Sequence, residues 1–163
     1  MKNNNIKSIV ISALGMALVF LATYLIKIPN GIQGYFNLGD GFIMLFASII
    51  NPWMAFLIGG IGSALADIAG GYAIYFIPTL FIKGLEGFLI AFIFQRIKTN
   101  LKYISYAIGA LIMVSGYFLC DSFINNSWAL GLSGIPANLL QGGVGIVIAL
   151  LALPILKRNI KDI

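Results

Sequence analysis

The sequence predicts an all-α integral membrane protein, a bundle of six transmembrane helices in a single domain over residues 1–163. Three observations predict it. Sixty per cent of the residues are hydrophobic and only 9% are charged, whereas a soluble domain carries about 25% charged residues. The mean hydropathy is +1.00. Most of the apolar runs approach the length of about 20 residues that a helix needs to cross a bilayer.

The first apolar run follows Lys2 and Lys7 and continues too far for the core of a signal peptide, so we interpret it as a retained helix. Pro29, Gly31 and Gly34 then break the chain. The second run is too short to cross a membrane alone. We expect the six helices at residues 8–26, 38–50, 54–69, 74–94, 103–121 and 135–156.

The connections between the later helices have their own signals. Asn51-Pro52-Trp53 predicts a tight turn before the third helix, and Gly70-Gly71 ends that helix. A basic turn over residues 95–102 precedes the fifth helix. Residues 122–134 are polar, and we expect a loop there. A basic tail follows the sixth helix.

Basic residues in the expected loops are distributed very unevenly. Only Lys27 falls in a loop on the side opposite the termini. Because cytoplasmic loops carry the excess of Lys and Arg, we expect both termini to be cytoplasmic in a multi-pass plasma-membrane protein. The basic residues on the side of the termini are Lys2, Lys7, Arg96, Lys98, Lys102, Lys157, Arg158 and Lys161.

Several function classes are disfavoured by what the sequence lacks. The chain has no histidine and only Cys120, which argues against a metal site, a disulfide and the commonest general base. It has no Gly-rich loop of the ATP-binding type. The net charge of +5 follows from membrane topology, so nucleic acid is not expected as a partner. We therefore expect no enzyme activity and no cofactor.

The remaining polar residues gather in the outer half of the expected bundle. The stretch from Asp67 to Glu86 is central, since Lys83 and Glu86 are three residues apart and share a helix face. Charges inside a membrane are costly and tend to mark binding sites. We expect a polar pocket open to the outside. The candidate ligand-binding residues are Tyr35, Asn37, Asp40, Asp67, Tyr72, Tyr75, Lys83, Glu86, Asp121, Trp128, Asn138 and Gln141.

Each of these candidates has an alternative interpretation. Lys83 and Glu86 can form a purely structural ion pair. Asn37 and Asp40 stand where a helix begins, a position that suits capping residues. The aromatic candidates can belong to an interfacial belt. Ala13 and Ala17 form a small-residue face on the first helix, which suits close contact with a neighbouring helix or a partner protein.

In their order and spacing, these residues resemble the substrate-binding S component of an energy-coupling factor (ECF) vitamin transporter, of the riboflavin-type or vitamin-precursor branch. The segments that carry the resemblance are Ala13 and Ala17, Asn37-Leu-Gly-Asp40, Gly62-Ser-Ala-Leu-Ala-Asp67, Gly71-Tyr72 and Lys83-Gly-Leu-Glu-Gly87. The resemblance implies capture of a vitamin from outside. It also implies docking, through Ala13 and Ala17, onto a transmembrane scaffold subunit that is carried by two ATPase subunits.

The expected ligand is a small, flat, neutral heteroaromatic molecule, pyridoxine-like or hydroxymethylpyrimidine-like. Riboflavin is the alternative that the resemblance leaves open. Two other classes also remain open at this stage. One is a stand-alone secondary transporter that is proton-coupled through Asp67 and Glu86. The other is a membrane enzyme or assembly factor.

Overall fold

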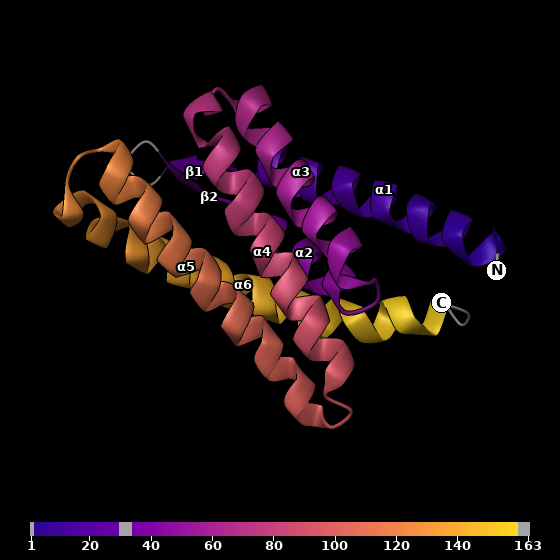
Figure 1. The fold of residues 1–163 in the computed structure, drawn as a ribbon. Helices are drawn as coiled ribbons and strands as arrows, with labels where there is room; N and C mark the ends of the chain where they lie inside the picture. The colour runs from indigo at the N-terminus through magenta and orange to yellow at the C-terminus, as the bar shows by residue number, and fades with distance from the viewer. Residues whose placement is uncertain (1, 30–33, 160–163) are drawn as a thin grey trace.

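The computed structural model describes residues 2–29 and 34–159, and within them the chain forms six α-helices and one short hairpin (Figure 1). The hairpin pairs β1 with β2 antiparallel, with Ile28 opposite Phe36. Gly31, which we expected to break the chain, falls outside the described residues. The elements are α1 (Lys2–Leu25), β1 (Ile28–Pro29), β2 (Tyr35–Phe36), α2 (Gly39–Ala47), α3 (Pro52–Gly70), η1 (Ala73–Tyr75), α4 (Phe76–Arg96), η2 (Asn100–Tyr103), α5 (Ile104–Ile124) and α6 (Trp128–Asn159).

The predicted all-α class is confirmed, and five of the described helices are long and apolar enough to cross a membrane. The exception is α2, which has only nine residues. The sequence predicted that this helix is too short to cross a membrane alone. It contacts α1, α3, α4 and α6. A helix surrounded by protein does not need to match the bilayer thickness, because its ends are not exposed to lipid.

The long helices form a closed sequence of contacts, from α1 to α3, α4, α5 and α6, which α2 completes by packing on both α6 and α1. Both chain ends lie at one end of this bundle, which we call the terminus end, and the hairpin lies at the other, the hairpin end (Figure 1). The contact between α3 and α4 is close. A Cβ atom at Gly59 would lie 2.4 Å from the carbonyl oxygen of Lys83.

Apolar and polar interiors are separated along the bundle. The terminus half has an apolar core in which Ile43, Ile58, Ile90 and Leu153 are essentially inaccessible to solvent. In the described residues, the buried carboxylates and the buried lysine all belong to the hairpin half. The buried charged groups therefore end against a mainly apolar floor.

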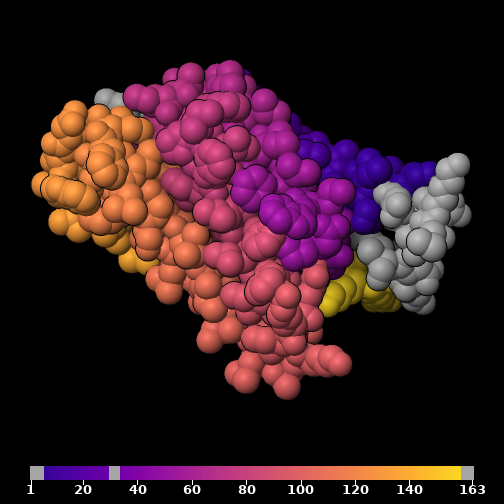
Figure 2. All heavy atoms as spheres, in the orientation of Figure 1, coloured from indigo at the N-terminus to yellow at the C-terminus, as the bar shows by residue number. Residues whose placement is uncertain are grey.

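The corner between α5 and α6 differs from the expected loop at residues 122–134. There α5 continues to Ile124 and α6 already begins at Trp128, so most of the polar segment is helical. The Ser127 hydroxyl accepts a hydrogen bond from the Leu130 amide at 3.4 Å, a capping contact that starts a helix. Pro136 then lies inside α6, as membrane helices tolerate. The corner forms a lobe at one end of the molecule (Figure 2).

Candidate functional site

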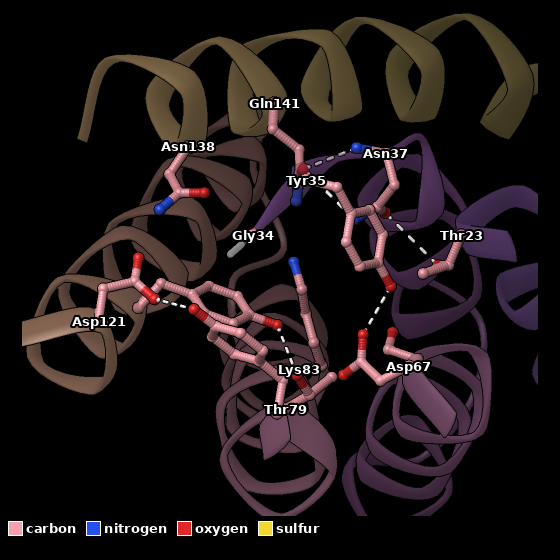
Figure 3. Close-up of a pocket in the computed structure, with 13 residues that line it drawn as sticks. Thr23, Gly34, Tyr35, Asn37, Asp67, Thr79, Lys83, Asp121, Asn138 and Gln141 are labelled. Carbon is pink, nitrogen blue, oxygen red and sulfur yellow. Dashed lines mark hydrogen bonds between the residues drawn. The ribbon is translucent and has the colours of Figure 1, made fainter. Parts of the chain in front are cut away.

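A cavity opens at the hairpin end, and every described α-helix except α2 contributes to its wall (Figure 3). It contains about 450 Å³ of space free of atoms, including solvent at its mouth. The segment around β2, and η1 through Tyr75, supply the remaining wall. The lining residues are Thr23, Gly34, Tyr35, Asn37, Ser63, Asp67, Tyr75, Thr79, Lys83, Tyr117, Asp121, Asn138 and Gln141.

Eight of the twelve residues predicted to bind ligand line this cavity. They are Tyr35, Asn37, Asp67, Tyr75, Lys83, Asp121, Asn138 and Gln141. The other four lie elsewhere. Asp40 and Glu86 are buried and do not line the cavity. Tyr72 packs on Tyr35, with 4.6 Å between ring centroids. Trp128 is 60% exposed and its ring packs on Phe118 and Phe123.

A buried ion network lies beside the cavity. The Lys83 ammonium group donates to Asp40 Oδ1 and, at 3.3 Å, to Glu86 Oε2. Gln141 Nε2 donates to the other oxygen of Asp40 at 2.9 Å. One cation thus holds two carboxylates in a setting where an isolated charge is very costly. The network joins α2, α4 and α6.

A set of side-chain amide hydrogen bonds, which we call the amide relay, holds the segment between β2 and α2 in place. Gln141 Oε1 accepts hydrogen bonds from the backbone nitrogen of Asn37 at 2.8 Å and from its side-chain amide at 3.3 Å. Asn37 Oδ1 in turn accepts from the Gly39 amide at 2.9 Å, although Leu38 rather than Asn37 directly precedes α2. The relay connects the polar side of α6 to the start of α2.

Two further carboxylates are held by tyrosines. Tyr35 donates to Asp67 Oδ1 at 2.6 Å, and Tyr75 donates to Asp121 Oδ1 at 2.8 Å. Burial, and then the negative charge of Asp67, raise the pKa of the Tyr35 hydroxyl above its ordinary value. Tyr35 therefore stays protonated and remains a donor to Asp67.

Aromatic rings surround the single lysine at the mouth. The Lys27 ammonium lies 4.4 Å from the ring centroid of Tyr24 and less than 6 Å from those of Tyr35 and Tyr72. These are cation–π distances. The tyrosine that contacts Asp67 inside the cavity is therefore also tied to the rim.

Five lining residues were missed by the sequence reasoning: Thr23, Gly34, Ser63, Thr79 and Tyr117. Three of them share a signal. Ser63, Thr79 and Tyr117 each stand four residues before a predicted charged residue on the same helix, and residues four apart share a face. Thr23 and Gly34 had no comparable signal.

Ala13 and Ala17 lie outside this site. Both are exposed on α1, whereas Ser12, Gly15 and Val19 on the same helix are buried. The two alanines therefore point away from the bundle. This leaves a surface along α1 on which small side chains allow another helix to approach closely.

Comparison of the sequence with known protein families assigns the chain to one of them. The sequence model of the ECF-type riboflavin transporter S component matches residues 3–158. The chain belongs to this family. As an S component it is a subunit of a multi-pass membrane transport complex rather than a stand-alone enzyme.

Among the described residues, no group of three side chains suited to a metal ion lies together.

Individual relatives of this S component cover it to different extents. It is 28% identical over 161 residues to the thiamine precursor transporter HmpT of Lactococcus lactis subsp. cremoris strain MG1363. This match covers 98% of the chain and 93% of the relative. It is 41% identical over 102 residues to an uncharacterized protein of Pyrococcus woesei, or 61% of the chain and 68% of that protein. A UPF0397 protein of L. lactis subsp. cremoris strain NZ9000 is 40% identical over 68 residues, or 41% of the chain and 37% of that protein.

Proposed function

We propose that this S component captures a vitamin precursor of the hydroxymethylpyrimidine type in the cavity at the hairpin end. The observation that carries the proposal is the similarity to the lactococcal thiamine precursor transporter, which extends over nearly the whole of both chains. Identity of 28% leaves the lining residues free to differ, so the chemistry of the cavity is the second support.

The cavity suits a small polar aromatic ring. The Tyr75 and Tyr117 rings line it and lie 6.5 Å apart. Around them stand amides, hydroxyls and carboxylates, which can both accept from an amino group and donate to a ring nitrogen or hydroxyl.

The orientation that we propose puts the cavity outside and both termini in the cytoplasm. The basic residues support it, because Arg96 ends α4 at the terminus end and Lys98 and Lys102 follow it, while Lys27 lies at the cavity mouth. Lys161, which we also assigned to the cytoplasmic side, falls outside the described residues. Ligand then enters from outside, and an apolar floor separates it from the cytoplasm.

Transport in this proposal depends on other subunits. The exposed face at Ala13 and Ala17 docks onto a transmembrane scaffold subunit, and two ATPase subunits supply the energy. Among the described residues, the buried charged groups end halfway along the bundle. This favours a binding subunit over a secondary transporter that works alone.

Riboflavin is the second candidate ligand, and the description of the matched family favours it. Its three fused rings and long polar chain need more room than a single pyrimidine ring. The two ligands are therefore best compared in one experiment.

The experiment is calorimetric titration of the purified chain in detergent, without ATP, using 4-amino-5-hydroxymethylpyrimidine, pyridoxine and riboflavin in turn. We expect saturable binding of the pyrimidine at low micromolar concentration or below, with weaker binding of the other two. Tighter binding of riboflavin would replace the pyrimidine with the second candidate. Absence of binding by all three would contradict the proposal.

A further inference from the structure

Two buried polar atoms at the cavity wall have no hydrogen-bond partner among the described residues. They are Ser63 Oγ and Asp67 Oδ2, and their residues are only 1% and 3% exposed. Both residues line the cavity from α3, where they are four apart and share a face. A buried polar group without a partner is costly. Glu86 Oε1 and Ser105 Oγ also have no partner, but of the four atoms only those of Ser63 and Asp67 belong to residues that line the cavity, where a ligand can reach them.

The groups nearest to Asp67 do not neutralise its charge. Its other oxygen accepts from Tyr35 at 2.6 Å, but a tyrosine hydroxyl brings no positive charge. The Thr79 hydroxyl, paired with Tyr117 at 3.0 Å, lies close enough to stabilise the Asp67 carboxylate but brings no positive charge either. Lys83 is already shared by two other carboxylates, as described above.

The charges around the cavity are therefore unbalanced. Among the described residues, four buried carboxyl groups, those of Asp40, Asp67, Glu86 and Asp121, accompany one buried ammonium group, that of Lys83. Lys83 and, from the rim, Lys27 both act on Asp67. One ammonium group cannot balance four charged carboxylates in a site of low dielectric constant, so the interior needs further protons, carried by the carboxyl groups or by a cationic ligand.

We propose that the cavity takes its ligand as a cation, a protonated aminopyrimidine whose ring N–H donates to Asp67 Oδ2. This rests on the function proposed above and specifies the chemical form of the substrate. In a protonated 4-aminopyrimidine the proton sits mainly on the ring nitrogen opposite the amino group, and the amino group shares the positive charge. Asp67 Oδ2 accepts from that ring nitrogen, and Ser63 Oγ bonds another polar group of the ligand. Charge-assisted hydrogen bonds of this kind are stronger than neutral ones.

Asp67 is then the residue that determines specificity for basic rings. The proton on the ring comes either from the solvent at the mouth or from Asp67 itself. Both routes end with the same complex, a cationic ring against a carboxylate. The decisive quantity is therefore the charge of the bound ring rather than the dependence of affinity on pH.

The test uses ¹⁵N-labelled 4-amino-5-hydroxymethylpyrimidine bound to the full chain in lipid nanodiscs, at a pH where the free ring is neutral. We expect the ¹⁵N chemical shift of one ring nitrogen to move to the position of the protonated ring. A bound ring that keeps the neutral shift would overturn the inference.

Two variants test the role of Asp67 directly. Asp67→Asn should weaken binding by about 10- to 140-fold, the factor that corresponds to losing a hydrogen bond to a charged group. Any ring that still binds should show the neutral shift. Asp67→Glu keeps a carboxylate at this position, so a ring that it binds should show the protonated shift. A protonated shift in Asp67→Asn would contradict the role of Asp67.

A matched ligand completes the test. In 2-aminobenzyl alcohol the amino and hydroxymethyl groups remain and C–H groups replace the ring nitrogens. It should bind about 10- to 140-fold more weakly than the pyrimidine. Equal affinity would overturn the inference and leave the proposed function intact. Absence of pyrimidine binding to the unmodified chain would remove both.

Discussion

Ala13→Leu should abolish ATP-driven uptake while ligand binding by the purified chain stays unchanged. Ala13 is exposed on α1 and lies far along the helix from the cavity. A leucine side chain there keeps a partner helix from approaching closely, which is the property that small residues provide. Ala17→Leu should behave in the same way, since it lies one turn further on the same face.

The measurement is uptake of labelled 4-amino-5-hydroxymethylpyrimidine by cells that make the complete transporter, alongside calorimetry on each purified variant. Ala107→Leu is the matched control. Ala107 is also exposed, but it belongs to α5, which does not pack against α1, so uptake should persist. Normal uptake by Ala13→Leu would contradict docking through α1. Uptake into liposomes that contain this chain alone would instead favour a stand-alone transporter.

Lys83→Met should lower the free energy of unfolding by about 3–5 kcal/mol, the usual cost of removing one partner from a buried ion network. The substitution leaves Asp40 and Glu86 buried without their shared cation. Ligand binding should be lost as well, because Lys83 lines the cavity. Denaturant unfolding of the detergent-solubilised protein measures the first effect and calorimetry the second.

Glu86→Gln is the natural comparison for Lys83→Met. It keeps the size of the side chain and leaves Lys83 paired with Asp40. We expect it to cost about 1 kcal/mol, the net value of a typical hydrogen bond. If the two variants were equally stable, the network would not be the buried charge cluster that the structure describes. Unchanged ligand affinity in both would assign Lys83 a structural role only.

The location of the site was predictable from the sequence because charge is costly inside a membrane. Asp67, Lys83 and Asp121 are far apart along the chain, yet alternating helix directions bring them to one end of a bundle. The same reasoning does not separate lining residues from supporting ones. Asp40 and Glu86 have carboxyl groups as Asp67 does, but the rotation of α2 and α4 about their axes directs these groups toward Lys83 in the ion network. That rotation depends on tertiary packing.

The hydroxyl groups of the wall were harder to predict. A serine or threonine in a membrane helix often satisfies its hydroxyl on its own backbone, as Ser12 and Ser48 do here. Its presence in an apolar run therefore indicates little. Ser63 and Thr79 differ because each precedes a charged residue by one helical turn. The pairing with a charge, rather than the hydroxyl itself, was the usable signal.

Trp128 shows how an error in a helix boundary moves a side chain. We expected residues 122–134 to form a loop beside the cavity, and Trp128 was a candidate contact within it. Because α6 begins at Trp128, the ring instead packs on Phe118 and Phe123 from α5. The polar residues predicted the loop, but capping by Ser127 allows the helix to start earlier.

Mass spectrometry of the small molecule that co-purifies with the chain tests the central claim most directly. The protein is made in cells that contain both riboflavin and the pyrimidine, purified, and denatured to release whatever it holds. We predict an aminopyrimidine with a hydroxymethyl group in stoichiometric amount from the unmodified chain, and its loss from Asp67→Asn. Release of riboflavin, or of no vitamin or vitamin precursor at all, would contradict the account.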